Sequence, residues 1–280
     1  MIEKEIKIEN EGAPEIRADL RTESPDSALP VIILCHGFLG FKSWGWFPLV
    51  SRELARAGFH VITFSFSMNG IDEKNGTISR SGEFSRNTVS RELKDMRQVL
   101  TFVENSFPFP ARADSVGLFG HSRGGAVAIL TAAENSRVKS LVTWSTPSRL
   151  DRYTESRKED WRRTGRLIFR GGKSENPLFL HYSYYLDIDA NREKFDLPRQ
   201  VERVDIPHLI IQGQRDAAVT LREARGLTGR TGTNSRVRFE VIKGAGHTFG
   251  VRHPMISAPP RELSIAMEKT EEWFCDTMDR

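Results

Sequence analysis

The fold is decided by one stretch of the sequence, Val116-Gly-Leu-Phe-Gly120-His-Ser122-Arg-Gly124-Gly-Ala-Val-Ala-Ile-Leu-Thr-Ala-Ala133. It opens on a short apolar run that predicts a buried strand, and it closes on small apolar residues that predict a helix. Between them lies Gly-x-Ser-x-Gly in its strand–turn–helix setting. The glycines leave room for a sharp turn, so Ser122 is presented above the positive end of a helix dipole. Ser122 is the candidate nucleophile; the alternative is a glycine-rich turn in which the serine merely caps the helix.

A serine nucleophile needs a base to remove its proton and a carboxylate to orient that base. In this setting the chain order is serine, acid, histidine. Asp216 follows the apolar run 208–211, and His247 follows the run 237–242. Both lie just past the end of a predicted strand, where open α/β sheets place their sites. We predict a triad of Ser122, Asp216 and His247; the alternatives are an ordinary turn at Asp216 and a surface histidine at His247. Three other acids are rivals for this role, but none follows a predicted strand in the right place: Asp187, Asp189 and Asp205.

Acyl transfer places negative charge on the carbonyl oxygen, and backbone N–H groups usually stabilise it. One should come from the residue after the nucleophile, Arg123. The other should come from the loop His36-Gly-Phe38-Leu-Gly40, which follows the apolar run Val31–Cys35. We predict the amides of Phe38 and Arg123 as this oxyanion hole; a simple strand-ending turn is the alternative.

Apolar strand-like runs alternate with helical patterns along most of the chain, which predicts an α/β fold with a mostly parallel sheet and helices on both faces. An N-terminal hairpin precedes the first buried strand. The region 147–204 breaks this rhythm with many charges and aromatics, and contains one potential hairpin formed by Arg166–Arg170 and Leu178–Leu180 around Gly171-Gly172. We predict a core domain of residues 1–146 and 205–280 with an inserted cap at 147–204; a long surface excursion is the alternative.

Composition narrows the functional classes. Lys and Arg total 41 and Asp and Glu 37, giving a net charge of +4, but the charges are interspersed and no nucleic-acid motif occurs, so we expect no nucleic-acid partner. No apolar run is long enough for a membrane span, and the first ten residues do not resemble a signal peptide. Two unpaired cysteines and histidines without metal spacing predict a cytoplasmic protein with no metal and no cofactor. Composition does not determine an oligomeric state; a homodimer is compatible with it.

The first part of the predicted cap is strongly basic. Residues 147–173 hold nine Lys and Arg against four Asp and Glu, an excess of five positive charges. A solvated helical face is the plain explanation, since cations alternate with anions around Arg157–Arg163. The sharper hypothesis is that the cap attracts esters with an anionic or phenolic acid part, with Trp161 and nearby tyrosines stacking on a ring.

The motifs His36-Gly-Phe38, Gly120-His-Ser-Arg-Gly124, Gly213-Gln-Arg-Asp216 and Gly246-His247 resemble those of the α/β-hydrolase superfamily. Within it the chain is similar to bacterial dienelactone-hydrolase-like and cinnamoyl or feruloyl esterase-like proteins. This resemblance implies a serine carboxylesterase acting on small to medium esters, aromatic esters among them. Peptidase, thioesterase and C–C bond hydrolase activities use the same parts. A non-catalytic binding protein would be expected to lack part of the triad, and no part is missing here.

Overall fold

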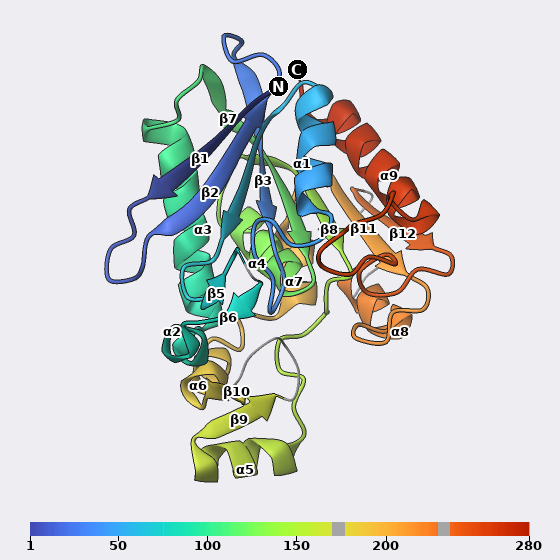
Figure 1. Ribbon diagram of the computed structural model, residues 1–280. Coiled ribbons are helices and arrows are strands. Elements are labelled where there is room, and N and C mark those ends of the chain that lie inside the picture. The colour runs from blue at the N-terminus through green and yellow to red at the C-terminus, as the bar shows by residue number, and fades with distance from the viewer. Residues whose placement is uncertain (75, 170–176, 229–235, 280) are drawn as a thin grey trace.

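The structure, a computed structural model, describes residues 1–74, 76–169, 177–228 and 236–279. Its centre is an eight-stranded sheet in the order β1-β2-β4-β3-β7-β8-β11-β12 (Figure 1). The first two pairings, β1 with β2 and β2 with β4, are antiparallel. From β4 through β12 every neighbouring pair is parallel. The predicted α/β fold with a mostly parallel sheet is therefore confirmed.

The strands of this sheet are β1 (Ile2–Ile8), β2 (Ile16–Thr22), β3 (Leu29–Cys35), β4 (His60–Ser65), β7 (Ala111–His121), β8 (Val138–Trp144), β11 (His208–Gly213) and β12 (Val237–Ile242). Two small sheets pair β5 (Ile71–Asp72) with β6 (Thr77–Ile78) and β9 (Arg166–Phe169) with β10 (Leu178–His181). The longer helices are α1 (Phe47–Arg56), α3 (Val89–Asn105), α4 (Arg123–Ala132), α5 (Glu155–Thr164), α6 (Ser183–Ala190) and α9 (Arg261–Thr277). Shorter ones are α2 (Ser81–Arg86), α7 (Leu197–Arg203), α8 (Leu221–Arg225) and the 3₁₀ turn Gly226–Thr228.

Helices cover both faces of the sheet, as continuous apolar strands require. Along β3, Ile33 and Cys35 join the core on the side of α3 and α4, whereas Ile32 and Leu34 join the core on the side of α1 and α9. This alternation is the two-residue period of a strand that is buried on both faces. Figure 1 shows α1 and α9 together on one side of the sheet and α3 on the other.

The region 147–204 contains α5, β9, β10, α6 and α7. The first four form the lower part of the molecule in Figure 1, whereas α7 lies higher, beside α4. The predicted hairpin is present as the antiparallel pair β9–β10, while its Gly171-Gly172 turn lies outside the described residues. Helix α7 packs against α4, with Leu197 and Val201 buried in the main core. The division into core and cap stays a prediction.

Candidate active site

The turn between β7 and α4 holds Ser122 in a backbone conformation that side chains rarely adopt, with φ 54° and ψ −123°. The close approach of the chain explains the flanking glycines. A Cβ at Gly120 would lie 2.5 Å from the carbonyl oxygen of Gly124, and a Cβ at Gly124 would lie 2.4 Å from that of His36. The Ser122 hydroxyl makes no capping hydrogen bond to the helix, so the capping alternative does not describe it.

The three residues of the predicted triad lie together in the structure. Ser122 Oγ is 3.1 Å from His247 Nε2, and His247 Nδ1 is 2.8 Å from Asp216 Oδ2. Asp216 comes from the loop after β11 and His247 from the loop after β12, so the parallel strands deliver both side chains to the same edge of the sheet. Because Asp216 accepts a hydrogen bond from Nδ1–H, the proton of the neutral imidazole stays on Nδ1. The lone pair of Nε2 is then free to accept the serine proton.

Asp216 is buried, and its carboxylate is nearly saturated with donors. Oδ1 accepts hydrogen bonds from the backbone N–H groups of Ala218 and Val219, both at 2.8 Å. Oδ2 accepts a further bond from Gln212 Nε2 at 3.1 Å. Burial alone would raise the pKa of Asp216, but the bond to His247 and the backbone N–H of Val219 outweigh it and hold the pKa below 3.8. The carboxylate therefore stays ionised and continues to orient the histidine.

Two buried histidines support the site without joining the triad. His121 Nε2 donates to the backbone carbonyl of His247 at 2.9 Å, which ties the loop of His247 to the turn that carries Ser122. His36 accepts from the backbone N–H of Phe66 at 3.0 Å and donates from Nδ1 to the carbonyl of Gly37 at 2.9 Å. Burial lowers the pKa of each to about 3, so both are neutral near pH 7.

The loop predicted to provide an oxyanion donor packs directly against the nucleophile. A Cβ at Gly37 would lie only 3.0 Å from Ser122 Cβ. Among the described residues, no backbone or side-chain acceptor takes a hydrogen bond from the amide of Phe38 or from that of Arg123. Both residues line the same cavity as Ser122, and their role as an oxyanion hole stays a prediction.

The rival acids lie elsewhere. Asp187 accepts a hydrogen bond from the backbone N–H of Ser90 at 2.9 Å, and Asp205 pairs with Arg236 at 3.0 Å. Asp189 pairs with Arg192. Within the part of the chain that the structure describes, no three His, Cys, Asp or Glu side chains gather as metal ligands would. No helix in that same part is long and apolar enough to cross a membrane.

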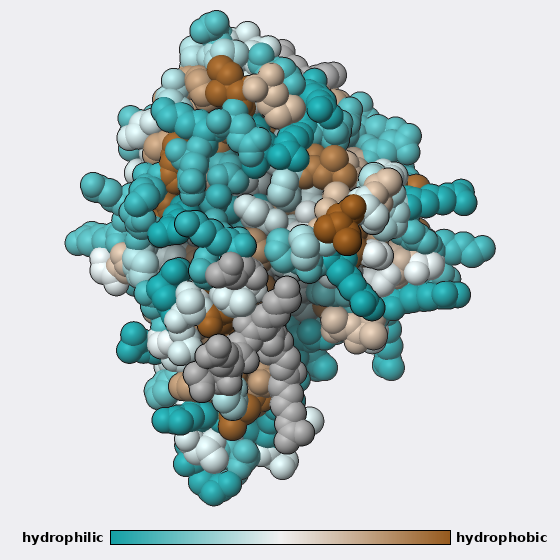
Figure 2. Space-filling model, viewed as in Figure 1, coloured by the Kyte–Doolittle hydropathy of each residue, from teal (hydrophilic) through white to brown (hydrophobic). Residues whose placement is uncertain are grey.

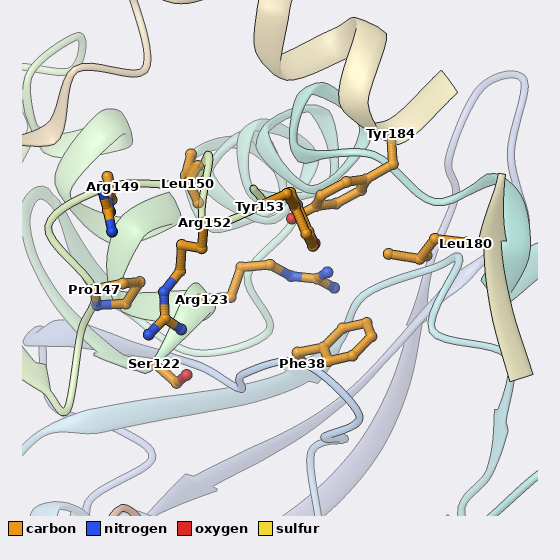
Figure 3. Close-up of a pocket in the computed structure, with 10 residues that line it drawn as sticks. All are labelled: Phe38, Ser122, Arg123, Pro147, Arg149, Leu150, Arg152, Tyr153, Leu180 and Tyr184. Atoms are coloured by element: carbon orange, nitrogen blue, oxygen red, sulfur yellow. The ribbon is translucent and has the colours of Figure 1, made fainter. Parts of the chain in front are cut away.

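Two cavities meet at Ser122. The first, of about 120 Å³, is polar on one side, and its wall includes three arginines, Arg123, Arg149 and Arg152 (Figure 3). The second, of about 190 Å³, is bounded by His247 and by apolar side chains that include Trp44 and Phe47. Phe38 and Ser122 line both, so the two cavities adjoin at the Ser122 side chain.

The Arg123 side chain is a feature that the sequence analysis did not anticipate. Its guanidinium pairs with Glu92, a nearly inaccessible carboxylate on α3, and lies 4.7 Å from the ring centre of Phe38. Burial raises the pKa of Glu92, although Arg123 opposes this shift. One signal was present in the sequence: Glu92 lies three residues after Val89, on the apolar face of its helix, where an unpaired charge would be costly.

The charges and aromatic residues of the predicted cap divide into two groups. On α5, Arg162 and Arg163 pair with Glu159 and Asp160, one turn away, on an exposed face that is largely hydrophilic in Figure 2. Arg149 and Arg152 instead line the cavity. The stacking role suggested for Trp161 does not fit, because its ring is fully buried and its N–H donates to the carbonyl of Leu180 at 3.0 Å. Tyr153 and Tyr184 reach the cavity in its place.

The chain belongs to the α/β hydrolase fold family, and the geometry described above agrees with this. The family model matches residues 30–169, half of the 280 residues of the chain. Among curated relatives, an uncharacterized 31.7 kDa protein from the traX-finO intergenic region of Escherichia coli is 32% identical over 114 residues, 41% of this chain and 36% of the relative. Protein phosphatase methylesterase 1 of Rattus norvegicus is 26% identical over 132 residues, 47% of this chain and 30% of the relative. The chain thus spans about a third of the length of these relatives.

Among solved structures, Est1E from Butyrivibrio proteoclasticus superposes with a TM-score of 0.70 at 18% identity, covering 98% of both chains. Est1E has also been solved with ferulic acid bound. At this identity the likeness concerns the fold, which extends over almost the whole chain.

Proposed function

We propose that this protein is a serine hydrolase that cleaves carboxylic esters. The observation that carries the proposal is the hydrogen-bonded series from Ser122 Oγ to His247 Nε2, at 3.1 Å, and from His247 Nδ1 to Asp216, at 2.8 Å. A serine poised in this way attacks an acyl carbon, and membership of the α/β hydrolase fold family agrees with that chemistry.

In the proposed reaction, Ser122 Oγ bonds to the ester carbon while its proton passes to His247 Nε2. The amides of Phe38 and Arg123 donate to the oxygen that becomes negative, and Asp216 stabilises the imidazolium. The intermediate collapses when His247 returns the proton to the departing alcohol, which leaves an acyl group on Ser122. Water, deprotonated by His247, then releases the carboxylic acid. Residues 147–204 act as a cap that supplies one wall of the acyl site.

The test combines covalent labelling with turnover. A fluorophosphonate probe should label the protein, and Ser122→Ala should abolish labelling and lower ester turnover by about a millionfold. Ser264→Ala, an exposed serine on α9, provides the matched control and should retain both. A panel of alkyl and aryl esters, with amide and thioester counterparts of the same acyl groups, tests the bond type. Labelling that persists in Ser122→Ala, or turnover of amides or thioesters alone, would contradict the proposal.

A further inference from the structure

The two cavities at Ser122 differ in their access to the catalytic base. In ester cleavage the histidine gives its proton to the leaving alcohol oxygen, so that oxygen must lie beside Nε2. His247 lines the aromatic cavity and is not among the residues that line the arginine cavity. The alcohol part of the substrate therefore belongs in the cavity of Trp44 and Phe47, and the acyl part extends into the cavity with the arginines.

The arginine cavity carries more positive than negative charge. Arg123 is paired with Glu92, and Arg152 is paired with Glu223 at 2.9 Å. Arg149 forms no ion pair within the described residues. The three guanidinium groups of the cavity wall are therefore balanced by only two paired carboxylates. Arg152 donates both of its hydrogen bonds, to Glu223 and to the carbonyl of Ala218, from the same nitrogen. Its other N–H groups remain available to a ligand.

The direction of these side chains matters for what they bind. In Figure 3 the Arg152 guanidinium points toward Ser122, between Pro147 and Arg123. Arg149 lies on the Pro147 side of the cavity. Arg123 points away from Ser122, toward Phe38 and Leu180. Arg123 is held by Glu92 and by the rings of Phe38 and Tyr184, with centroids at 4.7 and 5.8 Å. A guanidinium with free N–H groups in a partly enclosed site suits a carboxylate.

We propose that the preferred substrates are half-esters of short dicarboxylic acids, in which the free carboxylate binds Arg152 and Arg149 and an apolar alcohol occupies the Trp44 cavity. This inference rests on the proposed esterase function and adds the substrate class. The volume of about 120 Å³ limits the acyl group. One water molecule occupies about 10–15 Å³ of such a cavity. If each non-hydrogen atom of a ligand takes the space of one water, the cavity accepts roughly ten such atoms, which corresponds to diacids of about four to six carbons.

The experiment compares esters that differ only in acyl charge. Monobenzyl succinate carries the carboxylate, and benzyl isocaproate replaces it with a branched alkyl end of the same shape. The benzyl ester of γ-aminobutyrate carries a cation. For the wild-type protein, kcat/KM should be at least about tenfold higher for the succinate than for the isocaproate, the size of one charge-assisted hydrogen bond, and lowest for the cation. The preference for the succinate should shrink as salt is added.

Variants then connect the preference to the cavity. Arg152→Gln and Arg149→Gln should each lower the succinate-to-isocaproate ratio by about tenfold. Glu223→Gln removes the anion that competes for Arg152 and should raise the same ratio, a change opposite in sign to that expected from damage to the fold. Arg162→Gln, whose side chain pairs with Glu159 on the outer face of α5, is the matched control and should leave the ratio unchanged.

The outcomes separate this inference from the proposed function. Failure to hydrolyse any ester of the alkyl and aryl panel would remove the esterase proposal and this inference with it. Turnover of other esters of that panel, with none of the three benzyl esters hydrolysed, would overturn the inference alone. Hydrolysis of the isocaproate with no preference for the succinate, or a ratio that none of the three cavity variants changes, would overturn the inference alone. A preference for the phenylacetyl ester of glycolic acid, which carries its carboxylate on the alcohol side, would show that the two cavities are assigned the wrong way round.

Discussion

Replacing Asp216 with asparagine tests the triad through the orientation that the amide must take. The Oδ1 position faces two backbone N–H donors, those of Ala218 and Val219, at 2.8 Å. Placing the amide NH₂ there would leave the buried Val219 donor without an acceptor, at about 1–3 kcal/mol, and would also remove the acceptor of the part-buried Ala218 donor. The NH₂ therefore takes the Oδ2 position, where it opposes only Gln212 and His247. Gln212 retains another acceptor, the carbonyl of Val219 at 2.9 Å.

In that orientation the new N–H of Asp216→Asn donates to His247 Nδ1, so the imidazole proton moves to Nε2. A protonated Nε2 cannot accept from Ser122, and kcat should fall by about four orders of magnitude, or about 5.4 kcal/mol of activation free energy. The assay is ester turnover at pH 7, with Tm measured alongside to show that the fold persists. Asp187→Asn and Asp205→Asn are the controls. A loss of less than about tenfold in Asp216→Asn, or a comparable loss in either control, would refute the reasoning.

Three further changes test the surroundings of the site and one buried histidine at the far end of β11. Gly124→Ala brings a Cβ to 2.4 Å from the carbonyl oxygen of His36 and should lower the unfolding free energy by about 1–3 kcal/mol or more, whereas Gly82→Ala, with no atom within 4 Å, should not; equal Tm values would contradict this. Burial lowers the pKa of His208 from 6.5 to about 3, so the folded state binds this proton less readily than the unfolded state. The free energy of unfolding therefore decreases as the pH falls from 6.5 toward about 3. His208→Gln should reduce that loss by about 1.4 kcal/mol per pH unit in denaturant titrations, and an unchanged slope would count against it. Arg123→Met should cost about 3–5 kcal/mol by stranding Glu92, and adding Glu92→Gln should restore much of it; strictly additive effects in this cycle would argue against the pair.

The meeting of Ser122, His247 and Asp216 was predictable because its signals are local and topological. The glycines around Ser122 report a turn that admits no side chains, and a parallel sheet brings the loops after β11 and β12 to one edge whatever the details of packing. The apolar runs marked the parallel strands well because strands buried on both faces lack polar interruptions. The strands extend beyond the predicted runs where residues pair at the ends of the ladder, as β7 does at Ala111 and His121.

The contents of the two cavities were not predictable from the same signals. The sequence shows a basic region, but only tertiary packing separates Arg152, which lines the cavity, from Arg162, which pairs on the outer surface. The same limit explains the error at Trp161. An indole among tyrosines suits either a binding surface or a small core, and here the N–H finds a buried carbonyl, which favours the core.

The large cluster that joins α3 and α4 also contains Leu150, Trp161, Leu180 and Tyr184, so residues of the inserted region share one apolar interior with the sheet. A segment built in this way is not a detachable part. An exchange of residues 147–204 for the corresponding segment of a relative would replace part of the interior of the host domain as well as one wall of the proposed acyl site. Engineering a new specificity by transplantation would therefore require compensating changes on α3 and α4, whereas substitutions confined to the cavity side of Arg149 and Arg152 would leave that shared interior intact.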